Sequence, residues 1–215
     1  MQERNMKIYI IFLISILTFT SLMAQEKFIE FHGGILIPKD AKTGFIGGAS
    51  FGRMVDQSVG WGIEINYYRK SYTKEATYQL PSEGQVDPVT VVTEFENATT
   101  MLPVYFKLSL LTQIAPGLDL RLSGGLGYEF MWNSVVDHTV NIDESHFYSG
   151  FTWLAGAGLS MPVSGATDLF AEINYHHGSP SRDATETAEG LPVHTEVRMS
   201  GFMILAGIRL YSIGF

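Results

Sequence analysis

Cysteine is absent from the 215-residue sequence. Its absence excludes disulfide bonds, thiolate metal sites and cysteine nucleophiles, and it excludes a lipid anchor on an N-terminal cysteine. Basic residues are also scarce, because 14 lysines and arginines stand against 22 acidic residues and give a net charge of −8. Nucleic-acid phosphates are bound by clustered Lys and Arg. The composition therefore argues against nucleic acid as a partner.

Long apolar runs are lacking beyond the N-terminus. No later stretch approaches the roughly 18 consecutive apolar residues that indicate a membrane-spanning helix. The N-terminus carries Lys7, then a largely apolar run from Ile8 to Phe19, then the small residue Ala24. This is the order of a secretory signal, and the run is shorter than the ~20 residues that a spanning helix needs. We therefore expect a cleaved signal peptide at 1–24 and a mature chain at 25–215.

Glycine is abundant, with 22 residues, and 46% of the chain is hydrophobic while only 17% is charged. This composition is too apolar for a disordered chain and too rich in glycine for a helical bundle. From Phe28 onward, apolar and polar residues alternate with a period of two, in segments of about ten residues. The clearest segment runs from Leu118 to Trp132. The pattern predicts eight β-strands in one domain.

Alternation alone does not say which face of such a barrel is inside. A soluble lipocalin-like barrel also has eight strands, with its apolar face inward, but eight strands enclose a space that is only just wide enough to be filled by side chains. The apolar face here carries far too many large residues for that space, whereas the other face is dominated by Gly, Ser, Thr and a few charges. The apolar face is therefore expected to contact lipid. The predicted fold is an all-β, eight-stranded, antiparallel up-and-down transmembrane β-barrel.

Short and long connections between the predicted strands alternate, as they do in outer-membrane barrels. The short ones, expected to be periplasmic turns, are 56–58, 113–117 and 163–167; the long ones, expected to be extracellular loops, are 75–98, 134–146 and 179–195. The terminal Phe215 resembles the signal that the barrel assembly machinery reads. We expect an exported protein of a Gram-negative outer membrane, in contact with membrane lipid, lipopolysaccharide and the assembly machinery.

Aromatic residues gather near the ends of the predicted strands. Such positions suit interfacial girdles, where an apolar ring meets lipid headgroups and water. The residues assigned to these girdles are Trp61, Tyr67, Tyr128, Trp132 and Trp153, with Tyr68, Tyr72, Phe130, Tyr148 and Phe151 beside them.

The polar face of the predicted strands carries charges of both signs. Because desolvated charges must find partners, the pattern predicts an interior network of ion pairs and hydrogen bonds. A narrow polar conduit is the alternative. The predicted lumen-facing residues are Glu30, His32, Glu64, Lys107, Asp119, Arg121, Glu129, Glu172, His176 and Arg209.

Acidic residues gather in two predicted loops, at 137–144 and 183–189. Carboxylates there suit divalent cations that bridge lipopolysaccharide, although a solvated, charge-rich loop is the interpretation that we favour. The neighbours His176 and His177 are expected to point to opposite faces of their strand, so they do not form a metal site. We expect no bound metal and no cofactor.

Two segments resemble the small outer-membrane β-barrel families that include PorT-like and OmpA-like proteins. They are Leu-Pro-Val-Tyr-Phe-Lys at 102–107 and Ser-Gly-Gly-Leu-Gly-Tyr at 123–128, and a glycine-rich first hairpin precedes them. The resemblance implies the barrel fold and brings no catalytic residue with it. We therefore expect a non-enzymatic envelope protein whose extracellular loops bind other surfaces, ligands or a still unidentified protein partner.

One short motif leaves an enzymatic alternative open. His177 and Ser179 are expected on the outward face, at the extracellular end of their strand, and resemble the His-x-Ser of barrel lipid A deacylases. In those enzymes an acidic residue orients the imidazole, and Glu186 or Glu189 would take that role here. The continuation at 180–182 departs from the family pattern, because it lacks the expected Asn. A lipid A-modifying enzyme and a narrow channel are the two alternatives to a binding protein.

Overall fold

A computed structural model of the chain describes residues 26–39, 41–78, 90–137, 142–184 and 193–211. It contains the strands β1 (Lys27–Pro38), β2 (Gly44–Met54), β3 (Val59–Tyr78), β4 (Thr90–Ala115), β5 (Leu118–Asp137), β6 (Ile142–Ser164), β7 (Thr167–Gly178), β8 (Ser181–Ala184), β9 (Val193–Glu196) and β10 (Gly201–Tyr211). Within the described ranges, no helix is long and apolar enough to cross a membrane. The predicted signal peptide and Phe215 lie outside these ranges.

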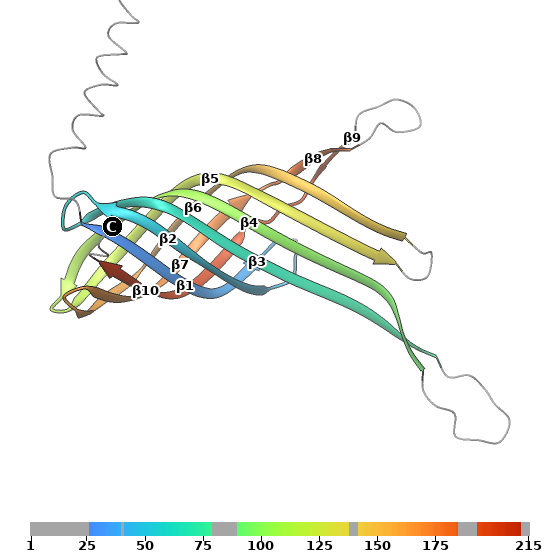
Figure 1. The fold of residues 1–215 in the computed structure, drawn as a ribbon, viewed down its shortest axis with the longest axis horizontal. Coiled ribbons are helices and arrows are strands. Elements are labelled where there is room, and N and C mark those ends of the chain that lie inside the picture. Colours follow the sequence, from blue (N-terminus) through green and yellow to red (C-terminus); the bar gives the residue numbers. More distant parts are fainter. Residues whose placement is uncertain (1–25, 40, 79–89, 138–141, 185–192, 212–215) are drawn as a thin grey trace, which may run out of the picture.

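Eight of the strands close into an antiparallel barrel (Figure 1). The strand order is β5-β4-β3-β2-β1-β10-β7-β6, and pairing between β5 and β6 closes the ring. The strands β8 and β9 form a separate short hairpin, which meets the barrel where Ser181 lies opposite Ser149. The predicted eight-stranded up-and-down barrel is confirmed, and the hairpin overlaps the predicted loop 179–195 and extends one residue beyond it, to Glu196.

Local chemistry explains the short turns at one end of the barrel. Between β2 and β3, Asp56 Oδ1 accepts hydrogen bonds from the backbone amides of Ser58 and Val59, both at 2.7 Å. Such a carboxylate replaces missing backbone partners in a tight turn. Between β4 and β5, Gly117 adopts a φ of +73°, which glycine reaches without a steric penalty. Both chain ends of the barrel, at β1 and β10, also lie at this end.

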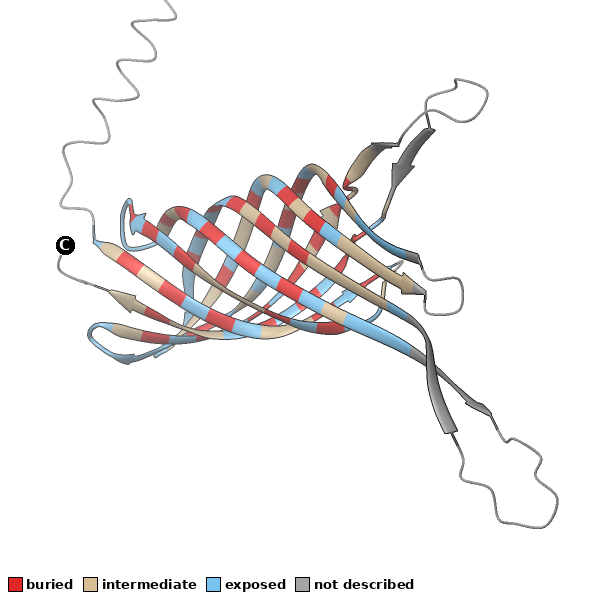
Figure 2. Ribbon diagram, turned by 45° about the vertical axis from the view of Figure 1, so that its right-hand side comes forward, coloured by how far each residue is buried: buried red, intermediate tan, exposed pale blue. Residues whose placement is uncertain are grey.

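Burial alternates residue by residue along the strands (Figure 2). Leu126 and Phe151 on the outside are 61% and 60% exposed, whereas Arg121 and Glu129 on the inside are at most 1% exposed. A solvent-facing surface would carry the charges instead. The apolar face therefore points outward, as the sequence predicts for a transmembrane barrel.

Four neighbouring strands are about twice as long as the other four. The strands β3, β4, β5 and β6 have 20, 26, 20 and 23 residues, whereas β1, β2, β7 and β10 have 11 or 12. A tilted strand needs only about 9–11 residues to cross a membrane. The long strands continue beyond the barrel rim as one sheet, at the right of Figure 1. We call it the projecting sheet; it comprises 69–78, 90–100, 132–137 and 142–147.

The projecting sheet corrects the predicted long loops at 75–98 and 134–146. Much of each segment is paired strand, since β3 pairs with β4 as far as Tyr78 and Thr90, and β5 pairs with β6 as far as Asp137 and Ile142. These segments are polar but rich in Thr and Val, and such β-branched residues favour strands whether or not the strand is buried.

The half of the lumen nearest the projecting sheet holds an apolar cluster that the sequence analysis did not predict. We call it the apolar plug; it consists of Leu36, Ile46, Tyr68, Met101, Tyr105, Met131, Tyr148, Leu154, Met199, Met203 and Leu205. Tyr68 and Tyr148 are at most 5% exposed, so their assignment to an interfacial girdle is wrong. Each lies on the inward phase of its strand, which places it among the lumen residues.

Candidate functional site in the barrel lumen and at its rim

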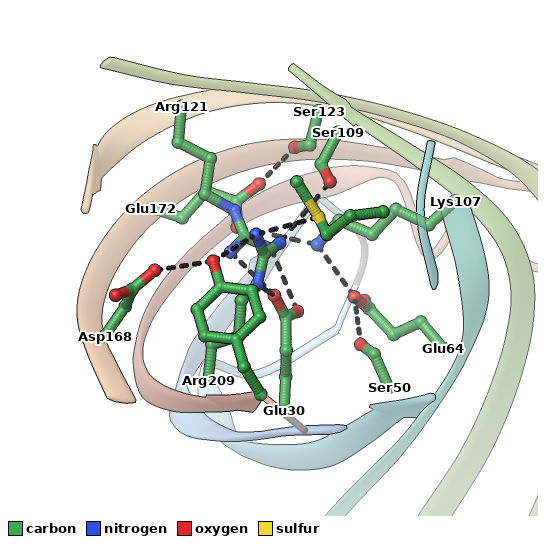
Figure 3. Close-up of polar contacts among 12 residues, drawn as sticks. Glu30, Ser50, Glu64, Lys107, Ser109, Arg121, Ser123, Asp168, Glu172 and Arg209 are labelled. Carbon is green, nitrogen blue, oxygen red and sulfur yellow. Dashed lines mark hydrogen bonds and ion pairs between the residues drawn. The ribbon is translucent and has the colours of Figure 1, made fainter. Parts of the chain in front are cut away.

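The other half of the lumen holds buried charges of both signs (Figure 3). We call this group the charged network; it consists of Glu30, Glu64, Lys107, Arg121, Glu172 and Arg209, each on a different strand. Period-two alternation turns all six side chains inward. Barrel closure then brings residues that are far apart in the sequence to a common centre.

The carboxylate of Glu30 accepts hydrogen bonds from both arginines of the charged network. Arg121 Nη1 and Nη2 donate to its Oε1 and Oε2 at 2.7 and 2.9 Å, and Arg209 Nε donates to Oε1 at 2.6 Å. Arg121 Nε also lies 3.2 Å from Glu172 Oε2. A fork-to-fork arginine–carboxylate pair is short, strong and directional. Arg121, on β5, therefore links carboxylates from β1 and β7, two strands that only β10 separates in the barrel wall.

Lys107 links the carboxylates of Glu64 and Glu172. Its Nζ donates to Glu64 Oε2 at 2.7 Å and lies 3.5 Å from Glu172 Oε2. Neutral groups complete the shell around Glu64, because Ser50 Oγ donates to Oε2 at 3.1 Å and Asn66 Nδ2 donates to Oε1 at 2.8 Å. Ser50 and Asn66 were missed by the sequence analysis, although they share the inward strand phase with the charged residues.

The lumen is filled at the level of the charged network. The cavity between Glu30, Lys107, Arg121 and Arg209 has a volume of only about 10 Å³. That is close to the smallest space that holds one water molecule. Toward the end with the short turns, Phe28 packs with Met54 and Leu111, and the guanidinium of Arg209 lies 4.4 Å from the centre of the Phe28 ring.

A second buried polar cluster lies against the apolar plug. His176 Nε2 is 3.1 Å from Glu129 Oε2, while Nδ1 is 2.6 Å from the hydroxyl of Tyr105 and 3.2 Å from Thr152 Oγ1. All four residues are fully buried. A side chain at Gly178 would collide with the carboxylate of Glu129, which explains the glycine there. Nδ1 of the imidazole contacts two hydroxyl groups, whereas Nε2 lies beside the Glu129 carboxylate without a well-aligned hydrogen bond.

The two remaining predicted lumen residues are His32, which is connected to Glu64 through Asn66, and Asp119. His32 is buried, and its Nε2 is 2.6 Å from Asn66 Oδ1. Asp119 is only half-buried near the turn end of β5 and belongs to neither cluster, so the structure does not bring it together with the others. It lies at the second position of its strand, where the inward face opens to solvent.

At the rim, His177 meets a residue that the sequence analysis did not single out. Its Nδ1 is 3.0 Å from Ser200 Oγ, and its ring lies 5.4 Å from that of Trp153 on the outer wall. Ser200 was missed because only the pairing of β10 with β7 brings it beside His177. In the described part of the chain no carboxylate joins this pair, and Glu186 and Glu189 lie outside it. The catalytic assignment of His177, Ser179 and Glu189 stays a prediction.

The aromatic residues assigned to the girdles lie on the outer wall. Tyr67, Tyr128 and Trp132 are 49%, 45% and 42% exposed, and Trp61 and Trp153 are half-buried by neighbouring rings. Trp61 lies near the turn end of β3, whereas the other four lie toward the projecting sheet. Their role at a membrane interface stays a prediction.

Among the residues that the structure describes, no group of three or more His, Asp and Glu is placed to hold a metal ion. The predicted acidic loops fall only partly within this region: Asp143 and Glu144 are exposed, and Glu144 Oε2 lies 3.0 Å from His146 Nε2. His176 is buried in the lumen while His177 faces the outer wall, so the two imidazoles do not share a ligand site.

No family model and no curated protein matches the chain, so its resemblance to PorT-like proteins stays a prediction. Solved structures do match. Ail of Yersinia pestis, solved with a heparin analogue, has a TM-score of 0.47 at 15% identity and covers 87% of this chain and 100% of its own. The Neisserial surface protein A has a TM-score of 0.46 at 16% identity, with coverages of 86% and 96%. A major outer-membrane protein of Thermus thermophilus has a TM-score of 0.50 at 12% identity, with coverages of 88% and 100%. At 12% identity, the likeness to the Thermus protein shows the fold alone, which is that of an outer-membrane β-barrel.

Proposed function

We propose that this chain is a non-enzymatic, surface-binding protein of the Gram-negative outer membrane, in which the barrel is an anchor and the projecting sheet binds molecules outside the cell. The observation that carries the proposal is the extra length of β3 to β6. Strands that served only to cross the membrane would end where β1, β2, β7 and β10 end.

The projecting sheet offers an unpaired edge. The pairing of β2 with β3 ends at Ile46 and Tyr68, whereas β3 continues to Tyr78 with β4 on its other side. Among the described residues, no strand covers the second edge of β3 from Arg69 onward. Unpaired strand edges are templates to which an extended segment of another protein can add. We infer that the unidentified partner includes such a segment.

The lumen supports an anchor rather than a conduit. The charged network leaves room for about one water molecule, and the apolar plug fills the level above it. Water and ions that crossed this level would have to displace the packed Leu, Met and Tyr side chains of the apolar plug, whose apolar atoms offer them no hydrogen bonds.

Site-specific photo-crosslinking on intact cells tests the proposal. A photoreactive residue is placed at Ser71, which is exposed on the uncovered stretch of β3, and a matched control at Leu108, which is 52% exposed on the lipid-facing wall. We expect protein adducts from position 71 and only lipid adducts from position 108. Absence of any protein adduct at position 71 would refute binding at the edge of β3.

A further inference from the structure

A pocket lies at the mouth of the barrel, between the loop that joins β1 to β2 and the foot of the projecting sheet. Its volume is about 200 Å³. We call it the mouth pocket; its lining includes Lys42, Tyr68, Lys70, Tyr72, Asn97 and Thr99. It is separate from the charged network, since the apolar plug, to which Tyr68 belongs, lies between the two.

Strand pairing and one loop contact build the mouth pocket. Tyr68, Lys70 and Tyr72 alternate along β3 and share its inward face, and Lys70 lies opposite Thr99 on β4. The hydroxyl of Tyr68 donates to the backbone carbonyl of Lys42 at 2.5 Å, which ties the loop to the wall. A side chain in place of Gly44 would lie 2.8 Å from the ring of Tyr68. The sequence therefore leaves space for this closure.

Two lysines, Lys42 and Lys70, line the mouth pocket, although the chain as a whole carries a net charge of −8. Lys42 Nζ lies 3.4 Å from the centre of the Tyr72 ring, so the ring holds the ammonium group over the pocket. Neither Lys42 nor Lys70 has a carboxylate partner within the described ranges, in contrast to Lys107, which has two. Two ammonium groups that face one hollow and have no carboxylate partner among the described residues attract an anion.

The volume of the mouth pocket and its level along the barrel limit the kind of anion that can bind there. The volume of about 200 Å³ is below the roughly 300 Å³ at which sites for drug-sized ligands begin, so one small group enters rather than a whole molecule. Lys70 lies three residues beyond Tyr67, about 10 Å further along the strand than the proposed aromatic girdle. This is the level of lipid headgroups and surface sugars. The amide of Asn97 adds a neutral hydrogen-bond donor at the wall.

We propose that the mouth pocket binds a phosphate monoester carried by a sugar, with Lys42 and Lys70 as its charge partners. The inference rests on the proposed function only in that both place the mouth of the barrel outside the cell. The phosphate comes either from the sugar headgroup of lipopolysaccharide or from a soluble sugar phosphate. Lysine suits it, because a compact, rotatable ammonium group binds phosphate as a point charge.

The test is an NMR titration of the full chain, folded in neutral detergent micelles, with glucose 6-phosphate and with glucose. A second arm uses neutral phospholipid nanodiscs with and without lipopolysaccharide. The side-chain amide of Asn97 reports on occupancy. We expect a saturable chemical-shift change with the phosphate-bearing probe, and we expect the affinity to fall when salt is added.

The double variant K42Q/K70Q should bind the probe roughly tenfold more weakly or worse. The control K39Q, which changes an exposed lysine of the same loop outside the pocket, should bind like the native protein.

The two arms of the titration distinguish the two sources of phosphate. A shift with glucose 6-phosphate identifies a soluble ligand, and a shift only with lipopolysaccharide identifies the headgroup; either result supports the site when it depends on Lys42 and Lys70. No saturable shift in either arm, or equal affinity in K42Q/K70Q and K39Q, would overturn it. Gel migration of unboiled samples confirms that each variant is folded. Protein adducts at Ser71 do not depend on the pocket lysines, so the proposed function survives if only this inference fails.

Discussion

Arg121 holds the charged network together, because it is the residue that contacts both Glu30 and Glu172. Replacing it by alanine leaves two buried carboxylates with too few partners. Removing one member of a buried ion pair costs about 3–5 kcal/mol. We expect Arg121→Ala to lower the free energy of unfolding by that amount, measured by urea titration in lipid vesicles. Arg53→Ala, at an exposed position of β2, should change it by less than about 0.5 kcal/mol. A similar small loss in both variants would show that the network contributes little.

His177 allows the enzymatic alternative to be tested. Its Nδ1 contacts the hydroxyl of Ser200, which also lies 3.3 Å from both the backbone nitrogen and the backbone oxygen of Gly178. A serine engaged with the backbone in this way is a structural contact. We expect lipid A from cells that express native protein, His177→Ala or no protein to have the same acyl chains by mass spectrometry. Fewer acyl chains only in cells with native protein would establish an enzyme.

Strand phase predicts which residues face the lumen, and it does so because side chains on a strand alternate with a strict period of two. It does not predict their partners. Glu30 and Arg209 are 179 positions apart, and Glu30 and Arg121 are 91 apart. Which inward residues meet depends on strand register and on the tilt of the closed barrel, and neither is encoded in any short stretch of sequence.

At the scale of elements, the projecting sheet shows where sequence reasoning falls short. The interpretation of 75–98 as loop relied on polarity, but a strand beyond the membrane has solvent on its faces and needs no apolar face. The apolar plug was missed for the converse reason. Met101, Met131 and Met203 lie on a phase that is elsewhere glycine and polar, and their burial follows only from barrel closure.

Shortening the β3–β4 hairpin tests whether the barrel can fold in the membrane without the part of the projecting sheet that we propose binds a partner. Residues 75–94 are replaced by Asn-Gly, which favours a two-residue turn, so that Lys70, Tyr72, Asn97 and Thr99 remain. The barrel should still fold and migrate faster on gels before boiling than after, because its own pairing ends at Tyr68 and Met101. We expect the protein adducts from position 71 to be lost. Retention of the same adducts at full yield would show that the removed strand residues are not part of the binding edge.

At the scale of the whole molecule, we propose that the packed lumen prevents the protein from conducting ions. The charged network and the apolar plug lie one above the other, and displacing either breaks many contacts at once. We expect planar-bilayer recordings of purified protein to show no discrete current steps. Steps that persist in a highly purified preparation and change size in Arg121→Ala would identify the lumen as their path and contradict a closed barrel.

A transmembrane barrel requires that its apolar outer wall lie in lipid. Because the chain contains no cysteine, single-cysteine variants can each carry one nitroxide label. Labels at Leu126 and Phe151, both on the outer wall, and at Ser71 on the projecting sheet are compared in lipid vesicles by electron paramagnetic resonance. We predict that dissolved oxygen relaxes the labels at Leu126 and Phe151 while a water-soluble nickel chelate does not, and that the chelate relaxes the label at Ser71. Equal access of the chelate to all three labels would contradict the account.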